Sequence, residues 1–182
     1  MRAETRSVSQ DYSKIYLVGF MGSGKTTLGR LLARRLGWEF HNLDDTIVAS
    51  RGVSIRTIFE EEGEPRFRAL ERAALARIAA TPGRAVVATG GGTFCAAENR
   101  ALIERTGVAI WLDQPFDRIW GRRELLADER PLFKGESEAR ALFETRRDFY
   151  GRAAVRILVE ENGFEQALEQ IVGFLATRSS PP

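Results

Sequence analysis

Residues 19–26 combine glycines, a lysine and a threonine in a spacing that suits phosphate binding. The segment GFMGSGKT matches G-x-x-x-x-G-K-[ST] at every position, follows an apolar run and precedes a helix-like run. In such a loop successive backbone N–H groups turn inward around phosphate oxygens, and the helix N-terminus adds partial positive charge. The pattern predicts ATP or GTP, held by Gly22, Ser23, Gly24, Lys25, Thr26 and Thr27.

Two residues of this loop are candidates for chemistry as well as binding. Lys25 is expected to reach the β- and γ-phosphates, and Thr26 to ligate Mg²⁺. The alternative is a glycine-rich turn that binds nothing. A phosphate loop serves ATPases, GTPases and small-molecule kinases alike, so the loop alone does not identify the group that receives the phosphate.

Such a loop must lie at the end of a strand, and five apolar runs predict the strands. The runs are short, rich in β-branched residues and bounded by turn residues or helical patterns, which is typical of buried parallel strands. They cover residues 14–20, 38–42, 85–90, 108–113 and 155–160.

Helical segments lie between these runs. Apolar residues share one helical face in three of them: Leu28, Leu31, Leu32 and Leu36; Phe67, Leu70, Ala74 and Ile78; and Phe164, Leu168, Ile171 and Leu175. The alternation of strands and helices predicts an α/β fold of three layers, α/β/α, around a five-stranded parallel sheet.

The length of 182 residues predicts one domain, which we place at residues 14–177 between a disordered leader (1–13) and a disordered tail (178–182). Two stretches depart from plain alternation. Residues 44–80 carry about three helical pieces, and residues 121–140 are charged and broken by Pro131 and Gly135. Insertions of this kind are often functional. We therefore expect a substrate-binding insertion at about 44–72 and a lid at about 121–137.

The composition excludes several classes of protein. The hydrophobic content is 43% and the formal net charge is +2. The arginines are scattered, so we expect no nucleic-acid partner. No apolar run approaches the length of a membrane span, and the start has no apolar core like that of a secretory signal. A single cysteine, Cys95, suits the cytoplasm, and monomer is the default expectation.

Several motifs in chain order resemble the shikimate kinase family, from about residue 14 to about residue 150. After the phosphate loop come NLDD, like the family's Asp-x-Asp, and FEEEGEPRFRALE, like its F-x-x-x-G-E-x-x-F-R-x-x-E. The segments TGGG, ERPLF and RRDFY follow, like its triple glycine, its R-P-L lid and its R-x-P-L-Y. The resemblance implies a nucleoside monophosphate kinase-like fold, with ATP, Mg²⁺ and shikimate as ligands.

The resemblance also implies roles for single residues. Asp44 would bind the acceptor and act as candidate base, although it could also be a helix N-cap. Arg68 would bind the carboxylate of the acceptor, held in position by Glu71; without the resemblance it reads as a surface arginine in a helical ion pair. Arg146 would be the second carboxylate arginine, with adjacent Arg147 as the alternative.

The triple glycine and the lid complete the implied site. Gly90, Gly91 and Gly92 would let the backbone approach the acceptor closely, or form only a strand-end turn. Arg130 would neutralise charge on the transferring phosphoryl group, and Arg123 would lie against adenine.

The sequence departs from the family at the first position of the Asp-x-Asp, which is Asn42. The family aspartate orients Mg²⁺ or its waters, and asparagine carries no charge. Three functions stay open, and Asn42 favours only the third. The first is a kinase that phosphorylates the 3-hydroxyl of shikimate. The second is a related kinase for another sugar acid such as gluconate, and the third is a non-catalytic ligand-binding module.

Overall fold

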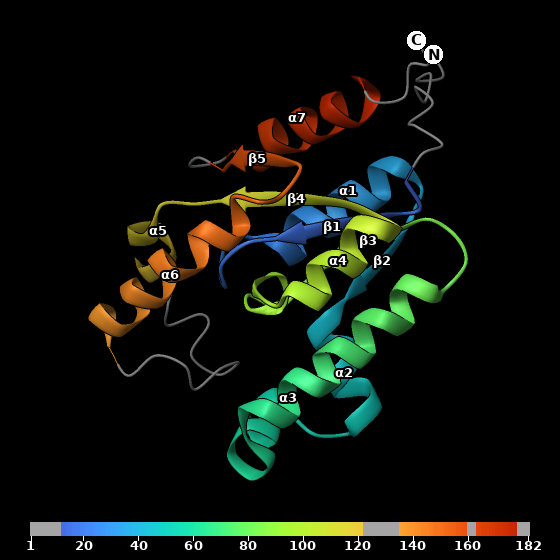
Figure 1. The fold of residues 1–182 in the computed structure, drawn as a ribbon. Coiled ribbons are helices and arrows are strands. Elements are labelled where there is room, and N and C mark those ends of the chain that lie inside the picture. The colour runs from blue at the N-terminus through green and yellow to red at the C-terminus, as the bar shows by residue number, and fades with distance from the viewer. Residues whose placement is uncertain (1–11, 122–134, 160–162, 178–182) are drawn as a thin grey trace.

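In the computed structural model, five parallel strands form one sheet between two layers of helices (Figure 1). The structure describes residues 12–121, 135–159 and 163–177. The strands are β1 (Lys14–Val18), β2 (Glu39–Asn42), β3 (Ala85–Ala88), β4 (Gly107–Asp113) and β5 (Val155–Leu158). Their order in the sheet is β2-β3-β1-β4-β5, and every neighbouring pair is parallel. The predicted α/β architecture with five parallel strands is confirmed.

Helices follow or precede each strand, as the alternation predicted. They are α1 (Lys25–Leu36), α2 (Leu43–Arg51), α3 (Ile55–Ala80), α4 (Ala97–Thr106), α5 (Phe116–Gly121), α6 (Glu136–Tyr150) and α7 (Phe164–Thr177), with a short 3-10 helix η1 (Thr93–Cys95). Among the described residues, no helix combines the length and apolar character needed to cross a membrane.

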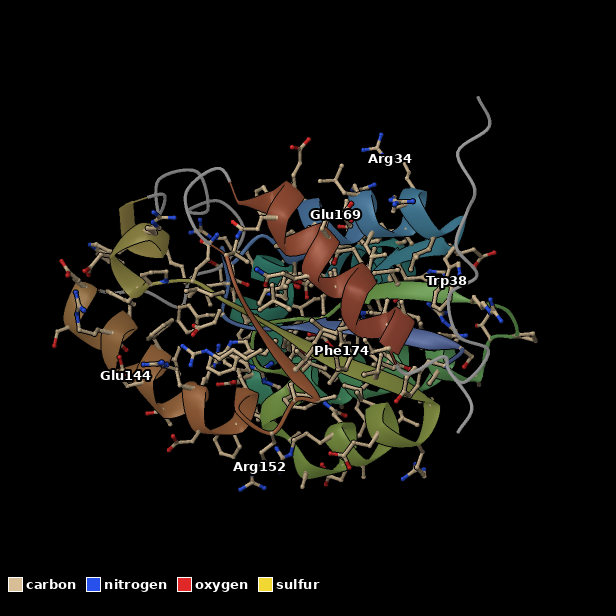
Figure 2. The ribbon with its side chains drawn as sticks, turned by 90° about the horizontal axis from the view of Figure 1, so that it is seen from above. Arg34, Trp38, Glu144, Arg152, Glu169 and Phe174 are labelled. Atoms are coloured by element: carbon tan, nitrogen blue, oxygen red, sulfur yellow. The ribbon has the colours of Figure 1, made fainter. Side chains whose placement is uncertain are left out.

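The sheet separates two apolar clusters. Residues of β1 alternate between them, since Tyr16 and Val18 pack with α3, α4 and α6, whereas Ile15 and Leu17 pack with α1 and α7. Figure 2 is seen from the side of the sheet that α1 and α7 cover. It shows α7 crossing the sheet beside α1, with Phe174 labelled on α7 and Arg34 on α1. The three predicted helical faces pack in these clusters except at Leu31, which is half-buried and belongs to neither cluster.

Four strands are shorter than the apolar runs suggested. The run at 14–20 ends as a strand at Val18, because Gly19 adopts φ 141° and starts the phosphate loop. The runs at 85–90 and 155–160 likewise end at Ala88 and Leu158, and the run at 38–42 begins as a strand at Glu39. Apolar residues such as Phe20, Trp38 and Val159 therefore lie in the loops beside the strands.

The two insertions have different outcomes. Residues 44–80 hold α2 and α3, and α3 is divided at Gly63 (φ 78°, ψ 169°), so the expected three helical pieces are present. The predicted lid at 121–137 falls mostly on residues 122–134, which lie outside the described residues. Its ends are helical, since Gly121 ends α5 and Glu136 begins α6.

Candidate active site

The phosphate loop joins β1 to α1 at the carboxyl edge of the sheet. Gly19, Gly22 and Gly24 have φ values of 141°, 74° and 89°, which L side chains rarely adopt. Lys25 folds back over the loop, and its Nζ donates to the backbone oxygens of Gly19 (2.8 Å) and Phe20 (2.7 Å). With 8% of its surface exposed, Lys25 holds its ammonium within the loop, where phosphate oxygens would lie.

The N-terminus of α1 is available to an anion. Its N-cap is Gly24, which has no side chain that could accept from the N–H groups of the first turn. The ring of Phe164, the first residue of α7, packs over this glycine. A Cβ at Gly24 would lie 2.5 Å from Phe164 Cε1. The sequence assigned Phe164 only to a helical face, and its contact with the loop was not predicted.

Asn42 connects the phosphate loop to the helix that carries Asp44. Its Oδ1 accepts the backbone N–H of Asp44 at 3.0 Å, which caps the N-terminus of α2. Its Nδ2 lies 3.4 Å from Thr26 Oγ1, to which it donates. The alternative that Asp44 is the N-cap is therefore wrong. Asn42 takes that position, and Asp44 lies in the first turn of α2.

The residues at this edge fit a magnesium ion bound together with a nucleotide. Thr26 is exposed and offers a hydroxyl oxygen, and Asn42 leaves one lone pair of that oxygen open. Mg²⁺ in nucleotide enzymes is held by one or two protein groups, substrate phosphates and waters. Thr26 is therefore the candidate protein ligand, and the described residues contain no group of three His, Cys, Asp or Glu that could hold a metal.

The triple glycine lies between the loop and α3, and side chains pack closely against it. A Cβ at Gly90 would overlap Glu71 Oε1 and lie 3.4 Å from Asp44 Oδ1. A Cβ at Gly92 would lie 2.6 Å from Nη1 of Arg68. A side chain at either position would therefore displace Glu71 or Arg68, because an acidic and a basic side chain approach the backbone there.

Arg68 is held by two carboxylates of its own helix. Its Nη1 donates to Glu71 Oε2 (2.9 Å), and its Nε and Nη2 donate to Glu64 Oε1 (3.1 and 2.9 Å). Glu71 is buried, with 1% exposed, which makes it a fixed partner. Burial opposes the charged guanidinium, but Glu71 and Glu64 outweigh burial and raise the pKa of Arg68. The predicted pairing of Arg68 with Glu71 is confirmed.

Arg146 and Arg147 face different surroundings. Arg146 is 7% exposed, and its Nη1 has no hydrogen-bond partner among the described residues. That nitrogen lies 3.4 Å from where a Cβ of Gly91 would be. Arg147 instead lies near Asp113 (3.9 Å) and Glu144 (3.7 Å). The buried cation beside the triple glycine is thus Arg146.

The structure brings most of the predicted residues to one edge of the sheet. Lys25, Thr26, Asp44 and the glycines follow the ends of β1, β2 and β3, while α3 and α6 contribute Arg68 and Arg146. Arg123 and Arg130 lie outside the described residues. Two residues were missed: Thr93, which donates to Glu71 (2.6 Å), and Tyr150, whose hydroxyl donates to the Gly91 carbonyl.

Comparison with known proteins places this geometry in a family. A model described as "Shikimate kinase" matches residues 21–176. A shikimate kinase of Persephonella marina is 42% identical over 160 residues, covering 87% of this chain and 96% of that protein. One of Geobacter metallireducens is 39% identical over 181 residues, covering 98% and 100%.

A solved structure gives the same result for the fold. The shikimate kinase of Acinetobacter baumannii in complex with shikimate superimposes with a TM-score of 0.86 at 32% identity, over 94% of this chain and 97% of that one. The family model spans both arginine-bearing helices, and the relatives and the solved structure each cover 87% or more of this chain. The chain belongs to the shikimate kinase family.

Proposed function

We propose that the protein transfers the γ-phosphoryl group of ATP to the 3-hydroxyl of shikimate, with ADP as the second product. The observation that carries the proposal is the pair of cations beside the triple glycine. Arg146 is buried, and its Nη1 has no hydrogen-bond partner within residues 12–121, 135–159 and 163–177, while Arg68 is fixed by Glu71 beside Gly92. A carboxylate accepts two parallel hydrogen bonds from a guanidinium, so an acidic acceptor fits between them.

The acceptor hydroxyl would then face the nucleotide. Asp44 lies against Gly90, and from there it would accept a hydrogen bond from the hydroxyl and take its proton as the phosphoryl group leaves ATP. Lys25 would turn from its backbone acceptors to the β- and γ-phosphates. Attack in line requires little more than this positioning and charge neutralisation.

Further ligand contacts belong to the same proposal. Gly22, Ser23, Gly24 and Thr27 would surround the phosphates, and Gly91 would contact the acceptor. Mg²⁺, held by Thr26, would neutralise phosphate charge. Arg130 would supply charge to the transferring group and Arg123 would lie against adenine. We also propose that the protein works as a monomer in the cytoplasm, without nucleic acid or membrane.

The test is ADP release from Mg²⁺-ATP with shikimate, with gluconate and with neither. Shikimate-dependent release is expected. In Arg146→Gln the KM for shikimate should rise tenfold or more, because one hydrogen bond between charged groups is worth about 1.5–3 kcal/mol. The neighbouring variant Arg147→Gln is the control and should change KM less than threefold. Equal effects in both variants, or release with gluconate alone, would refute this acceptor assignment.

A binding module without catalysis remains the second candidate, because Asn42 stands where the family has an aspartate. The wild-type protein and Asn42→Asp should be assayed side by side. Turnover in both supports the kinase. Turnover that appears only in Asn42→Asp would support a module that binds its ligands without phosphoryl transfer.

A further inference from the structure

The carboxylate that holds Arg68 is almost completely shielded from water. Glu71 is 1% exposed, and its two oxygens have different partners. Oε2 accepts from Arg68 Nη1 at 2.9 Å, and Oε1 accepts from Thr93 Oγ1 at 2.6 Å. A buried carboxylate oxygen without a donor is costly, so each partner matters to the orientation of the group.

Thr93 is rigidly placed to act as that donor. It is fully buried and opens η1, directly after the triple glycine. Its backbone N–H donates to the Gly90 carbonyl (3.2 Å), and its own carbonyl accepts from Asn99 Nδ2 (2.9 Å). The hydroxyl has a single proton, and the 2.6 Å contact commits it to Glu71 because an ionised carboxylate only accepts.

The carboxylate has little freedom to find another donor. Oε1 lies so close to Gly90 that a Cβ there would overlap it, so the turn itself blocks one side of the group. If the Thr93 hydroxyl were absent, the carboxylate would be expected to rotate so that Arg68 could serve both oxygens. Such a rotation would draw the guanidinium away from Gly92, which Nη1 now faces at 2.6 Å from the Cβ position.

We infer that Thr93 is a positioning residue for acceptor recognition: through Glu71 it fixes the direction in which Arg68 presents its guanidinium to a carboxylated acceptor. The inference deepens the proposed function and rests on it. The contacts run from Thr93 in η1 to the Glu71 carboxylate, and from there to Arg68. The orientation of the Arg68 guanidinium is therefore determined by η1, by α3 and by the triple glycine that adjoins both side chains.

The test compares Thr93→Val, which loses the hydroxyl at nearly constant volume, with Thr93→Ser, which keeps it. The matched control is Thr89→Val, because Thr89 is also buried but donates to the Leu17 carbonyl (2.9 Å). We expect the KM for shikimate, and its Kd measured without ATP, to rise about tenfold in Thr93→Val. Both constants should stay within twofold of wild type in Thr93→Ser and Thr89→Val, and the KM for ATP should not change.

Thr93→Ala removes the same hydroxyl without adding a methyl group. If Thr93→Val does not fold, Thr93→Ala is compared with Thr93→Ser and Thr89→Val in its place. A role in stability alone would lower Tm in the Thr93 and Thr89 variants alike and leave shikimate binding unchanged, which would overturn the inference. The wild-type assay separates the two proposals. No shikimate-dependent ADP release by wild type refutes the proposed function together with this inference, whereas normal wild-type turnover with unchanged KM in Thr93→Val refutes the inference only.

Discussion

Replacing Asn42 separates two contacts that this one side chain makes. Its oxygen caps α2 through the Asp44 N–H (3.0 Å), and its amide nitrogen faces the Thr26 hydroxyl (3.4 Å). Asn42→Asp keeps the capping oxygen and replaces the amide by a charged oxygen. Asn42→Ala removes both groups, so the pair of variants measures the cap and the charge independently.

The contribution of the Asn42 cap to α2 should be measurable as thermal stability. Loss of an N-cap asparagine costs about 1 kcal/mol, which for a chain of this size lowers Tm by about 2–4 °C. Asn42→Ala should show this decrease in thermal unfolding without ligands. Asn42→Asp should lie close to wild type, because aspartate caps as well as asparagine does and its charge suits the helix N-terminus, while nearby Asp44 and Asp45 oppose that charge.

The negative charge added in Asn42→Asp should lower the Mg²⁺ concentration that the protein requires. If Thr26 ligates the metal, an aspartate at position 42 adds a negative charge within a few ångströms of it, worth about 1 kcal/mol even when water screens it. The Mg²⁺ concentration for half-maximal activity should fall about fivefold in Asn42→Asp. The Mg²⁺ concentration needed for ATP to raise Tm should fall in parallel, and this second measurement does not depend on turnover.

Two outcomes would refute this reasoning. A Tm decrease in Asn42→Asp as large as that in Asn42→Ala would show that the oxygen of residue 42 does not cap α2. An unchanged Mg²⁺ requirement in Asn42→Asp, with the cap intact, would show that residue 42 does not face the metal, and Thr26 would lose its support as ligand.

Three further predictions concern other buried groups. Lys14→Met should lower the free energy of unfolding by about 1–2 kcal/mol in urea titrations, because two backbone carbonyls of the turn before β3 lose their donor (3.0 and 2.6 Å); an unchanged midpoint would contradict it. Burial raises the pKa of the Cys95 thiol while Arg146 and Arg68 lower it, so alkylation should require a pH above the ordinary thiol range, and higher still in Arg146→Gln. A shift to lower pH in that variant would contradict the placement of Arg146. Gly92→Ala should displace Arg68 and raise the KM for shikimate about tenfold or more with little change in Tm, whereas an unchanged KM would show that Arg68 does not serve the acceptor.

Most of the fold was predictable because its signals are local and repeated. Short β-branched runs alternating with helical faces predict a parallel sheet with two helical layers, and the structure confirms it. Strand ends were less predictable, because hydrophobicity reports burial and not hydrogen bonding. Residues 19 and 20 are as apolar as a strand requires, yet the backbone has already turned at Gly19 (φ 141°). The order of the strands could not be read from the sequence at all, since it depends on how distant runs pack.

The phosphate loop was predictable for a different reason. Its chemistry lies in one contiguous segment, so spacing alone identifies Lys25 and Thr26. The acceptor side is assembled from α2, α3, η1 and α6, and no local pattern indicates that these elements meet. The contact between Thr93 and Glu71 joins residues 22 positions apart, and each of them looks like an ordinary helix or turn residue on its own. Only the resemblance to a family placed Arg68 and Arg146 together.

Packing of α6, and not the sequence, determines whether Arg146 or Arg147 faces the triple glycine. Adjacent residues on a helix point about 100° apart, so only one of the two can face the triple glycine, and identical side chains give no signal of which one. The rotation of α6 is fixed one turn later, where the Tyr150 hydroxyl donates to the Gly91 carbonyl. Two other arginines lie near Asp113 at the end of β4. Its Oδ2 is 2.8 Å from Arg156 Nε and 3.9 Å from Arg147 Nη2. Arg147 therefore has partners outside the site, and the buried guanidinium nitrogen beside the glycines, which has no hydrogen-bond partner in the described part of the chain, belongs to Arg146.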